Sequence, residues 1–152
     1  MDERYECLLI KPEQKPEVVS IGTNIRDLQE AVGGWIEVIY PFEDEVGIIC
    51  NEEGKLEGLP LNRALRDDKG EIYDVVAGNM LVIGLEDDGF ASLTPEQLDK
   101  YEKEFHQPEC FVKMGRGIIA IPIMDDALEP KVDKACREIE KSAAKKMSVP
   151  AI

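Results

Sequence analysis

Short apolar runs of strand length recur along this chain, and turns rich in acidic residues, proline or glycine separate them. The runs span residues 5–10, 16–21, 35–40, 46–50, 72–76 and 79–84. Their length and composition predict β-strands. Because most links between them are shorter than the roughly twelve residues that a parallel crossover needs, the strands are predicted to pair largely in antiparallel fashion.

The runs 35–40 and 46–50 predict a β-hairpin, because only a short acidic turn separates them. Successive side chains of a strand alternate between the two faces of its sheet. The alternation places Trp35, Glu37 and Ile39 on one face and Ile36, Val38 and Tyr40 on the other.

Two helices are predicted from their capping residues. Asn24 precedes apolar positions at helical spacing, and the glycines at 33–34 supply a left-handed stop. Thr94 and Gln97 form a capping box, with Pro95 at the first helical position. The second helix is expected to continue through Tyr101 and Phe105 and to end before Pro108.

Three further segments complete the predicted fold. A helical turn is expected at 59–65, with a proline near its start, and one last strand or extended segment at 111–121. Residues 130–147 predict an amphipathic helix, which would dock either on its own domain or on a partner subunit. Its apolar stripe consists of Val132, Cys136, Ile139, Ala143 and Met147. The prediction is an α+β domain over 1–127, a small and mostly antiparallel sheet with two packed helices, followed by a C-terminal helical tail over 128–152.

Charge limits the partners that this chain is expected to bind. The 152 residues hold 32 Asp and Glu against 18 Lys and Arg, a formal net charge of −14. This balance argues against direct binding of nucleic acid phosphates, for which a basic face is expected. No apolar run reaches the ~20 residues that cross a bilayer, and the first residues do not resemble a signal peptide. A cytoplasmic location without membrane contact is therefore expected.

Sequence motifs give little support for catalysis. The four cysteines are scattered, the single histidine is His106, and neither has metal-ligand spacing. No phosphate-binding glycine loop or nucleophile motif is present in the sequence. We therefore predict no catalytic residue, no metal site and no cofactor. The enzymatic alternative is a nucleotide hydrolase that uses Glu37, Glu52 or Glu53 with a metal ion.

The segment 50–65 gathers polar side chains that form directional hydrogen bonds. Arg63 offers a planar fork for carboxylate or phosphate, and Asn51 and Asn62 both donate and accept. The neighbouring predicted strand adds an aromatic surface. The predicted ligand-binding residues are Trp35, Glu37, Tyr40, Asn51, Glu52, Asn62 and Arg63. The alternative is structural, with the asparagines fixing a turn and a cap and Arg63 pairing with a carboxylate.

Three stretches of the chain resemble an uncharacterised family. These are 32–41 (VGGWIEVIYP), 49–56 (ICNEEGKL) and 58–65 (GLPLNRAL), within a resemblance that covers about residues 7–105. The chain looks like a domain of unknown function found in phages, prophages and conjugative elements of Gram-positive bacteria. The resemblance implies no catalytic residue; it implies an accessory role against host defences.

Two functions are expected to compete. The first is a non-catalytic binding module that sequesters a small nucleotide-like ligand, with Arg63 on a phosphate and Trp35 or Tyr40 stacking on a base. The second is an acidic DNA mimic or protein-binding inhibitor of a host defence factor, which the charge of −16 over residues 1–127 favours. Exposed strand edges make a homo-oligomer plausible in either case.

Overall fold

The computed structural model of the chain describes residues 3–87 and 89–123. Its centre is an antiparallel sheet in the order β2-β1-β7-β4-β3, with β8 pairing to β7. The strands are β1 (Arg4–Ile10), β2 (Glu17–Gly22), β3 (Ile36–Ile39), β4 (Val46–Asn51), β7 (Met80–Glu86) and β8 (Gly89–Ala91). The antiparallel pairing and the β3–β4 hairpin agree with the prediction.

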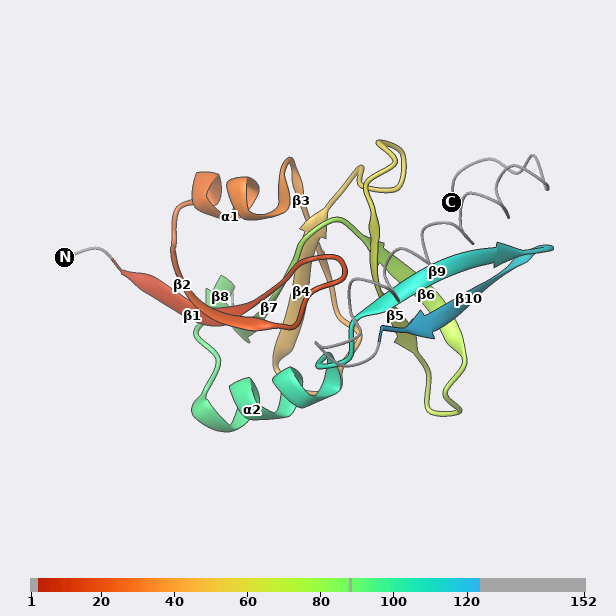
Figure 1. Cartoon of the computed structure of the whole chain (residues 1–152). Coiled ribbons are helices and arrows are strands. Elements are labelled where there is room, and N and C mark those ends of the chain that lie inside the picture. The colour runs from red at the N-terminus through yellow and green to blue at the C-terminus, as the bar shows by residue number, and fades with distance from the viewer. Residues whose placement is uncertain (1–2, 88, 124–152) are drawn as a thin grey trace.

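Two helices lie on opposite faces of this sheet, as Figure 1 shows: α1 (Ile25–Val32) above it and α2 (Pro95–Glu104) below it. The alternation of β7 separates the two cores. Leu81 and Ile83 pack with the apolar side of α1, whereas Met80 and Val82 pack with the buried aromatic residues of α2 and its C-cap. A strand buried on both faces is apolar at every position, and β7 is so from Met80 to Ile83.

Both helices begin as their sequences predict; α1 also ends at the predicted glycine, and α2 ends at Glu104, one residue earlier than expected. The Asn24 side chain accepts a hydrogen bond from the Arg26 backbone, and Gly33 ends α1 with a φ of 78°. Thr94 and Gln97 form the reciprocal capping box of α2. Caps are local interactions, so the sequence around each terminus is sufficient to place it.

Two hairpins extend the molecule beyond the central sheet. β5 (Leu61–Arg66) pairs with β6 (Ile72–Ala77), and β9 (Glu109–Met114) pairs with β10 (Gly117–Pro122). A small apolar cluster joins the hairpins, with Ala64 on β5, Val75 on β6 and Phe111 on β9 at its centre. The hairpins lie on the side of the sheet away from the N-terminus (Figure 1).

The predicted α+β class is wrong, because the described residues form a β-rich fold of ten strands and two helices of eight and ten residues. The helical turn expected at 59–65 is strand β5. Pairing with β6 gives this segment backbone partners that a single helical turn would lack. The extended segment at 111–121 is a full hairpin, and β8 was not predicted.

The predicted tail over 128–152 and its apolar stripe lie outside the described residues, as does the end of the domain predicted over 1–127. Within 3–87 and 89–123, neither helix is long and apolar enough to cross a membrane.

Candidate functional site

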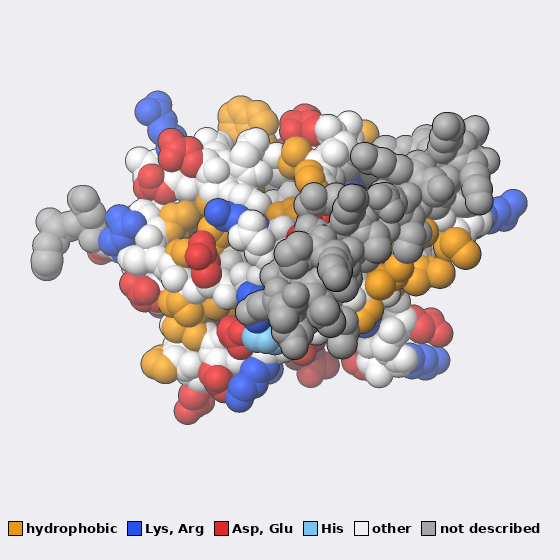
Figure 2. Space-filling view, viewed as in Figure 1, with side chains coloured by type: hydrophobic (Ala, Val, Ile, Leu, Met, Phe, Trp, Pro, Cys, Tyr) orange, Lys and Arg blue, Asp and Glu red, His pale blue; other side chains and the backbone are white. Residues whose placement is uncertain are grey.

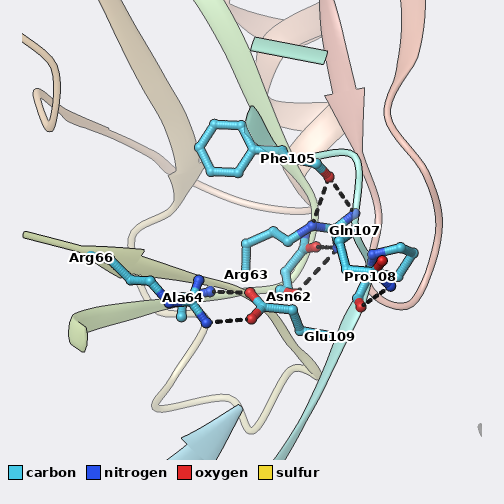
Figure 3. Close-up of polar contacts among 8 residues, drawn as sticks. All are labelled: Asn62, Arg63, Ala64, Arg66, Phe105, Gln107, Pro108 and Glu109. Carbon is cyan, nitrogen blue, oxygen red and sulfur yellow. Dashed lines mark hydrogen bonds and ion pairs between the residues drawn. The ribbon is translucent and has the colours of Figure 1, made fainter. Parts of the chain in front are cut away.

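Arg63, the predicted phosphate contact, is one of the largest fully buried side chains. Its Nε and Nη2 donate to the Phe105 carbonyl, and Nη2 also donates to the Gln14 carbonyl at 2.6 Å. Its Nη1 donates to the carbonyl and side-chain oxygens of Asn62 (Figure 3). Because a guanidinium has five N–H groups, these bonds leave Arg63 no donor for a phosphate.

The position of Arg63 explains why the protein holds this buried cation. Phe105 is the C-cap of α2, and the last carbonyls of a helix carry partial negative charge and have no partner within the helix. The guanidinium satisfies one of them. Burial lowers the pKa of Arg63 to about 10, and the nearby Glu109 carboxylate acts in the opposite direction, so Arg63 stays charged at neutral pH.

The two predicted asparagines also bond within the protein. The Asn62 amide donates to the carbonyls of Ile10 and Gly78, both at 2.8 Å, and its oxygen accepts from Arg63. The Asn51 amide donates to the carbonyl of Val32 at the end of α1, and its oxygen accepts from the backbone of the following turn. Both asparagines are buried. Asn51 fixes a turn, as the structural alternative expects, whereas Asn62 caps neither α1 nor α2 and Arg63 bonds carbonyls in place of the expected carboxylate.

A cleft of about 340 Å³ opens between β3, β4, the turn after β4, and β6. We call it the acidic cleft. It is lined by Glu37, Ile39, Cys50, Asn51, Glu52, Lys55, Leu56, Asp74, Val75, Val76 and Ala77. Gly54 holds the turn close to β6, because a Cβ at this position would lie 2.8 Å from the Ala77 carbonyl oxygen.

Pairing across β3 and β4 sets the polar side of the acidic cleft. Glu37 lies opposite Cys50, and the Glu52 backbone donates to the Trp35 carbonyl at 2.8 Å. Residues directly opposite each other share a face of the sheet. Trp35, Glu37 and Glu52 therefore follow one another along the side of the hairpin that faces the cleft.

Carboxylates outnumber cations in the acidic cleft, with Glu37, Glu52 and Asp74 against Lys55. Lys55 Nζ lies 2.5 Å from Asp74 Oδ1, and the exposed fraction of each of these two side chains is 40%. The cleft therefore presents mainly hydrogen-bond acceptors and negative charge. An ammonium or guanidinium group fits this chemistry, and a phosphate does not.

Cys50 is an unsuitable nucleophile. Its Sγ lies 3.9 Å from Glu37 Oε1, and burial, together with the charges of Glu37 and Asp74, raises the pKa of the thiol to about 11. A thiol reacts as its thiolate, which is scarce here at neutral pH. Within the described part of the chain, no group of three or more His, Cys, Asp or Glu side chains is arranged to hold a metal ion.

Three large apolar side chains are exposed on and near the β3–β4 hairpin. Leu56, at the tip of the turn, is 88% exposed, and Trp35 and Tyr40, at the two ends of β3, are 70% and 69% exposed. Trp35 lies on the cleft side of the hairpin, whereas alternation along β3 places Tyr40 on the other side. Exposed aromatic residues of this kind are enriched at protein interfaces.

The structure thus divides the predicted site. Glu37, Asn51 and Glu52 line the acidic cleft, and Trp35 lies on the same side of the hairpin, whereas Tyr40 lies on the other side. Asn62 is fully buried, and Arg63 forms part of the wall of a separate cleft of about 540 Å³. Sequence reasoning missed Asp74 and Lys55 as cleft residues. Asp74 had a usable signal, because it is a charged residue inside the apolar strand run 72–76.

The comparisons with known proteins give a family and no activity. A family model described as a domain of unknown function, DUF3846, matches residues 5–106. Comparison with curated proteins finds no match, and neither does comparison with solved structures. The matched region contains the central sheet, both helices, the β5–β6 hairpin and the whole acidic cleft. The chain therefore belongs to the family of the domain of unknown function DUF3846.

Proposed function

We propose that this chain is a non-catalytic binding module that captures a partner protein through a positively charged side chain placed in the acidic cleft. The observation that carries the proposal is the convergence of Glu37, Glu52 and Asp74 beside an apolar wall. A lysine or arginine side chain matches both parts, because its charged end pairs with carboxylates while its methylene stem covers apolar surface.

The surrounding chain favours a basic partner over an anionic ligand. Residues 36–77 contain eleven Asp and Glu against four Lys and Arg, a net charge of −7. Such a field attracts cations and slows the approach of anions. A nucleotide-like ligand would need a cationic contact for its phosphate, and Arg63 has no N–H left to provide one.

The second reading of the acidic charge, imitation of DNA, has less support. A mimic needs carboxylates in rows that match the phosphate spacing of a duplex. On the face seen in Figure 2, Asp and Glu side chains lie in separate groups among Lys, Arg and apolar side chains. In the mobile-element setting that the sequence resemblance implies, we propose a host defence factor as the captured partner.

The test uses the single tryptophan of the chain as its reporter. Trp35 lies beside the acidic cleft and is 70% exposed, so its fluorescence responds to an occupant. The probe is an acetylated and amidated seven-residue peptide of alternating Val and Lys, the Lys peptide. A matched Glu peptide carries Glu in place of Lys. We expect saturable binding of the Lys peptide alone.

Matched charge variants show where the Lys peptide binds. Exchanging Glu37→Gln together with Glu52→Gln removes two exposed charges from the cleft, and we expect the dissociation constant to rise about three- to tenfold. Glu17→Gln changes an exposed glutamate at the opposite edge of the sheet and serves as the control. Equal affinity of the wild-type protein, the double variant and Glu17→Gln for the Lys peptide would overturn the proposal. Tighter binding of AMP than of the Lys peptide would overturn it as well.

A further inference from the structure

The central sheet ends in two edges of different character. β3 ends one side of the strand order and β2 ends the other. An open edge exposes backbone N–H and C=O groups to which an additional strand can pair, and proteins commonly block such edges. Whether a given edge is blocked follows from the hydrogen bonds of its outward-facing residues.

The outward side of β2 is occupied. Glu6 lies opposite Ser20. Its backbone N–H donates to the Ser92 hydroxyl, and its carbonyl accepts from the Leu93 N–H, so both groups point away from β2. The backbone groups of Ser20 therefore point away from β1. The Arg4 guanidinium donates to the Ser20 carbonyl, at 2.6 Å, and to the Ser20 hydroxyl. A strand added at β2 would have to displace this arginine.

The outward side of β3 is open. The Glu52 N–H bonds to the Trp35 carbonyl, and inward-facing positions alternate along an antiparallel ladder. Glu37 and Ile39 consequently face β4, whereas Ile36 and Val38 present their N–H and C=O outward. Among the residues that the structure describes, none bonds to these outward groups. β3 contains neither proline nor lysine, the residues that most often protect an edge.

Strand addition at β3 would place a partner side chain at the acidic cleft. Because Glu37 faces β4 with its backbone, it would form a non-hydrogen-bonded pair with the residue opposite it on an added antiparallel strand. The Cα atoms of such pairs are about 4.5 Å apart, so their side chains touch. A lysine or arginine opposite Glu37 would meet the carboxylate at the cleft, and its neighbours would lie on the half-buried apolar face of Ile36 and Val38.

We infer that β3 is a docking edge at which an extended, basic segment of a partner protein pairs as an antiparallel strand, with apolar residues alternating with lysine or arginine. This inference rests on the proposed function and adds the conformation and residue pattern of the partner. A second copy of the chain fits the edge less well, because each copy carries a net charge of −14 and would bring Glu37 close to its counterpart.

The experiment compares two forms of the Lys peptide that differ only in backbone methylation. In the antiparallel arrangement the Val amides face β3 and the Lys amides face solvent. N-methylation of the Val amides is expected to abolish the change in Trp35 fluorescence, and N-methylation of the Lys amides to leave it. Loss with neither peptide, or with the Lys-methylated peptide alone, would overturn the inference.

Proline variants test the same edge from the side of the protein. Val38→Pro removes one outward N–H without removing a bond to β4, a position that an edge strand tolerates, and we expect about tenfold weaker binding of the Lys peptide. Val18→Pro is the matched control, because Val18 faces outward on β2 and is 57% exposed. Circular dichroism of both variants checks that each is folded before its affinity is compared.

The outcomes separate this inference from the proposed function. The Lys peptide can bind, and bind more weakly to the Glu37 and Glu52 variant, while methylation and Val38→Pro have no effect. That result would support binding in the acidic cleft and overturn strand addition at β3. If the Lys peptide does not bind at all, the proposed function falls first. Light scattering of the protein alone measures its oligomeric state. A dimer that Val38→Pro dissociates would identify a second copy as the occupant of β3 and overturn the inference.

Discussion

Arg63 shows how one side chain can be functional in appearance and structural in fact. The carbonyls it satisfies lie on α2's C-cap and in the turn after β1, 42 and 49 residues away in sequence. An arginine among asparagines looks the same in a sequence whether its partner is a ligand phosphate or a distant carbonyl. No local pattern could therefore assign Arg63, although the gathering of polar residues around it was recognisable.

Replacing Arg63 should destabilise the fold and leave binding intact. Arg63→Ala would leave several buried carbonyl oxygens without a donor, and each such loss costs about 1–3 kcal/mol. We therefore expect the free energy of unfolding in urea to fall by about 3 kcal/mol or more. Arg26→Ala, at an exposed position of α1, is the control and should change it by less than about 0.5 kcal/mol. Full stability of Arg63→Ala together with lost binding of the Lys peptide would return Arg63 to the binding site.

Cys50 gives the protein a defined sensitivity to alkali. Burial raises the pKa of its thiol from 9.0 to about 11, so the folded chain keeps a proton that the unfolded chain has lost. Stability from this group is complete below pH 9 and declines as pH rises towards 11, by at most about 1.4 kcal/mol per pH unit.

The measurement is urea unfolding of the wild-type protein and Cys50→Ala at several pH values between 9 and 11. The variant should lose stability less steeply, by the contribution of one proton. The thiol of Cys7, with a pKa raised to about 12 by burial and by Glu6, adds the same slope to both proteins and does not affect the comparison. Parallel slopes for the two proteins would contradict the raised pKa of Cys50.

At the scale of elements, the sequence was informative wherever structure depends on neighbouring residues. The caps of α1 and α2 and the β3–β4 hairpin were predictable because their signals lie within a few residues of one another. Segment 59–65 was misread as helical because Pro60 can begin a helix or precede a strand. Its pairing with β6, which decides between them, depends on tertiary contacts.

The acidic cleft was partly predictable for the same reason. Cross-strand neighbours such as Glu37 and Cys50 follow from the hairpin register, whereas the approach of Asp74 on β6 depends on how two separate sheets pack. Charged residues inside apolar strand runs are the signal that would have pointed to Asp74. β3 shows the converse, since its sequence predicts a strand but not that the strand ends the sheet.

At the scale of the whole molecule, the net charge of −14 acts on folding and on binding in opposite directions. Like charges repel within the compact chain, so salt should stabilise the fold by screening them. The attraction between the acidic cleft and a basic partner is screened by the same ions. The charge is uneven along the chain, with −7 over residues 36–77, the segment that contains β3 and every residue that lines the acidic cleft.

Raising sodium chloride from about 50 to about 300 mM should therefore raise the free energy of unfolding and weaken binding of the Lys peptide several-fold. Urea unfolding and Trp35 fluorescence titration at each concentration measure the two effects on the same sample. A peptide affinity that does not respond to salt would mean that apolar contact, rather than charge, holds the occupant. Sodium sulfate at matched ionic strength tests whether the change is specific to chloride.

The hydrogen bonds of Arg63 also connect distant parts of the region that matches the family. The matched region runs from residue 5 to residue 106, and Arg63 joins Gln14 near its beginning to Phe105 at its end. A side chain from the middle of the matched region thus joins its two ends. The β9–β10 hairpin begins just after Phe105 and contributes Phe111 to the apolar cluster on β5 and β6, so it packs onto a region whose two ends Arg63 already joins.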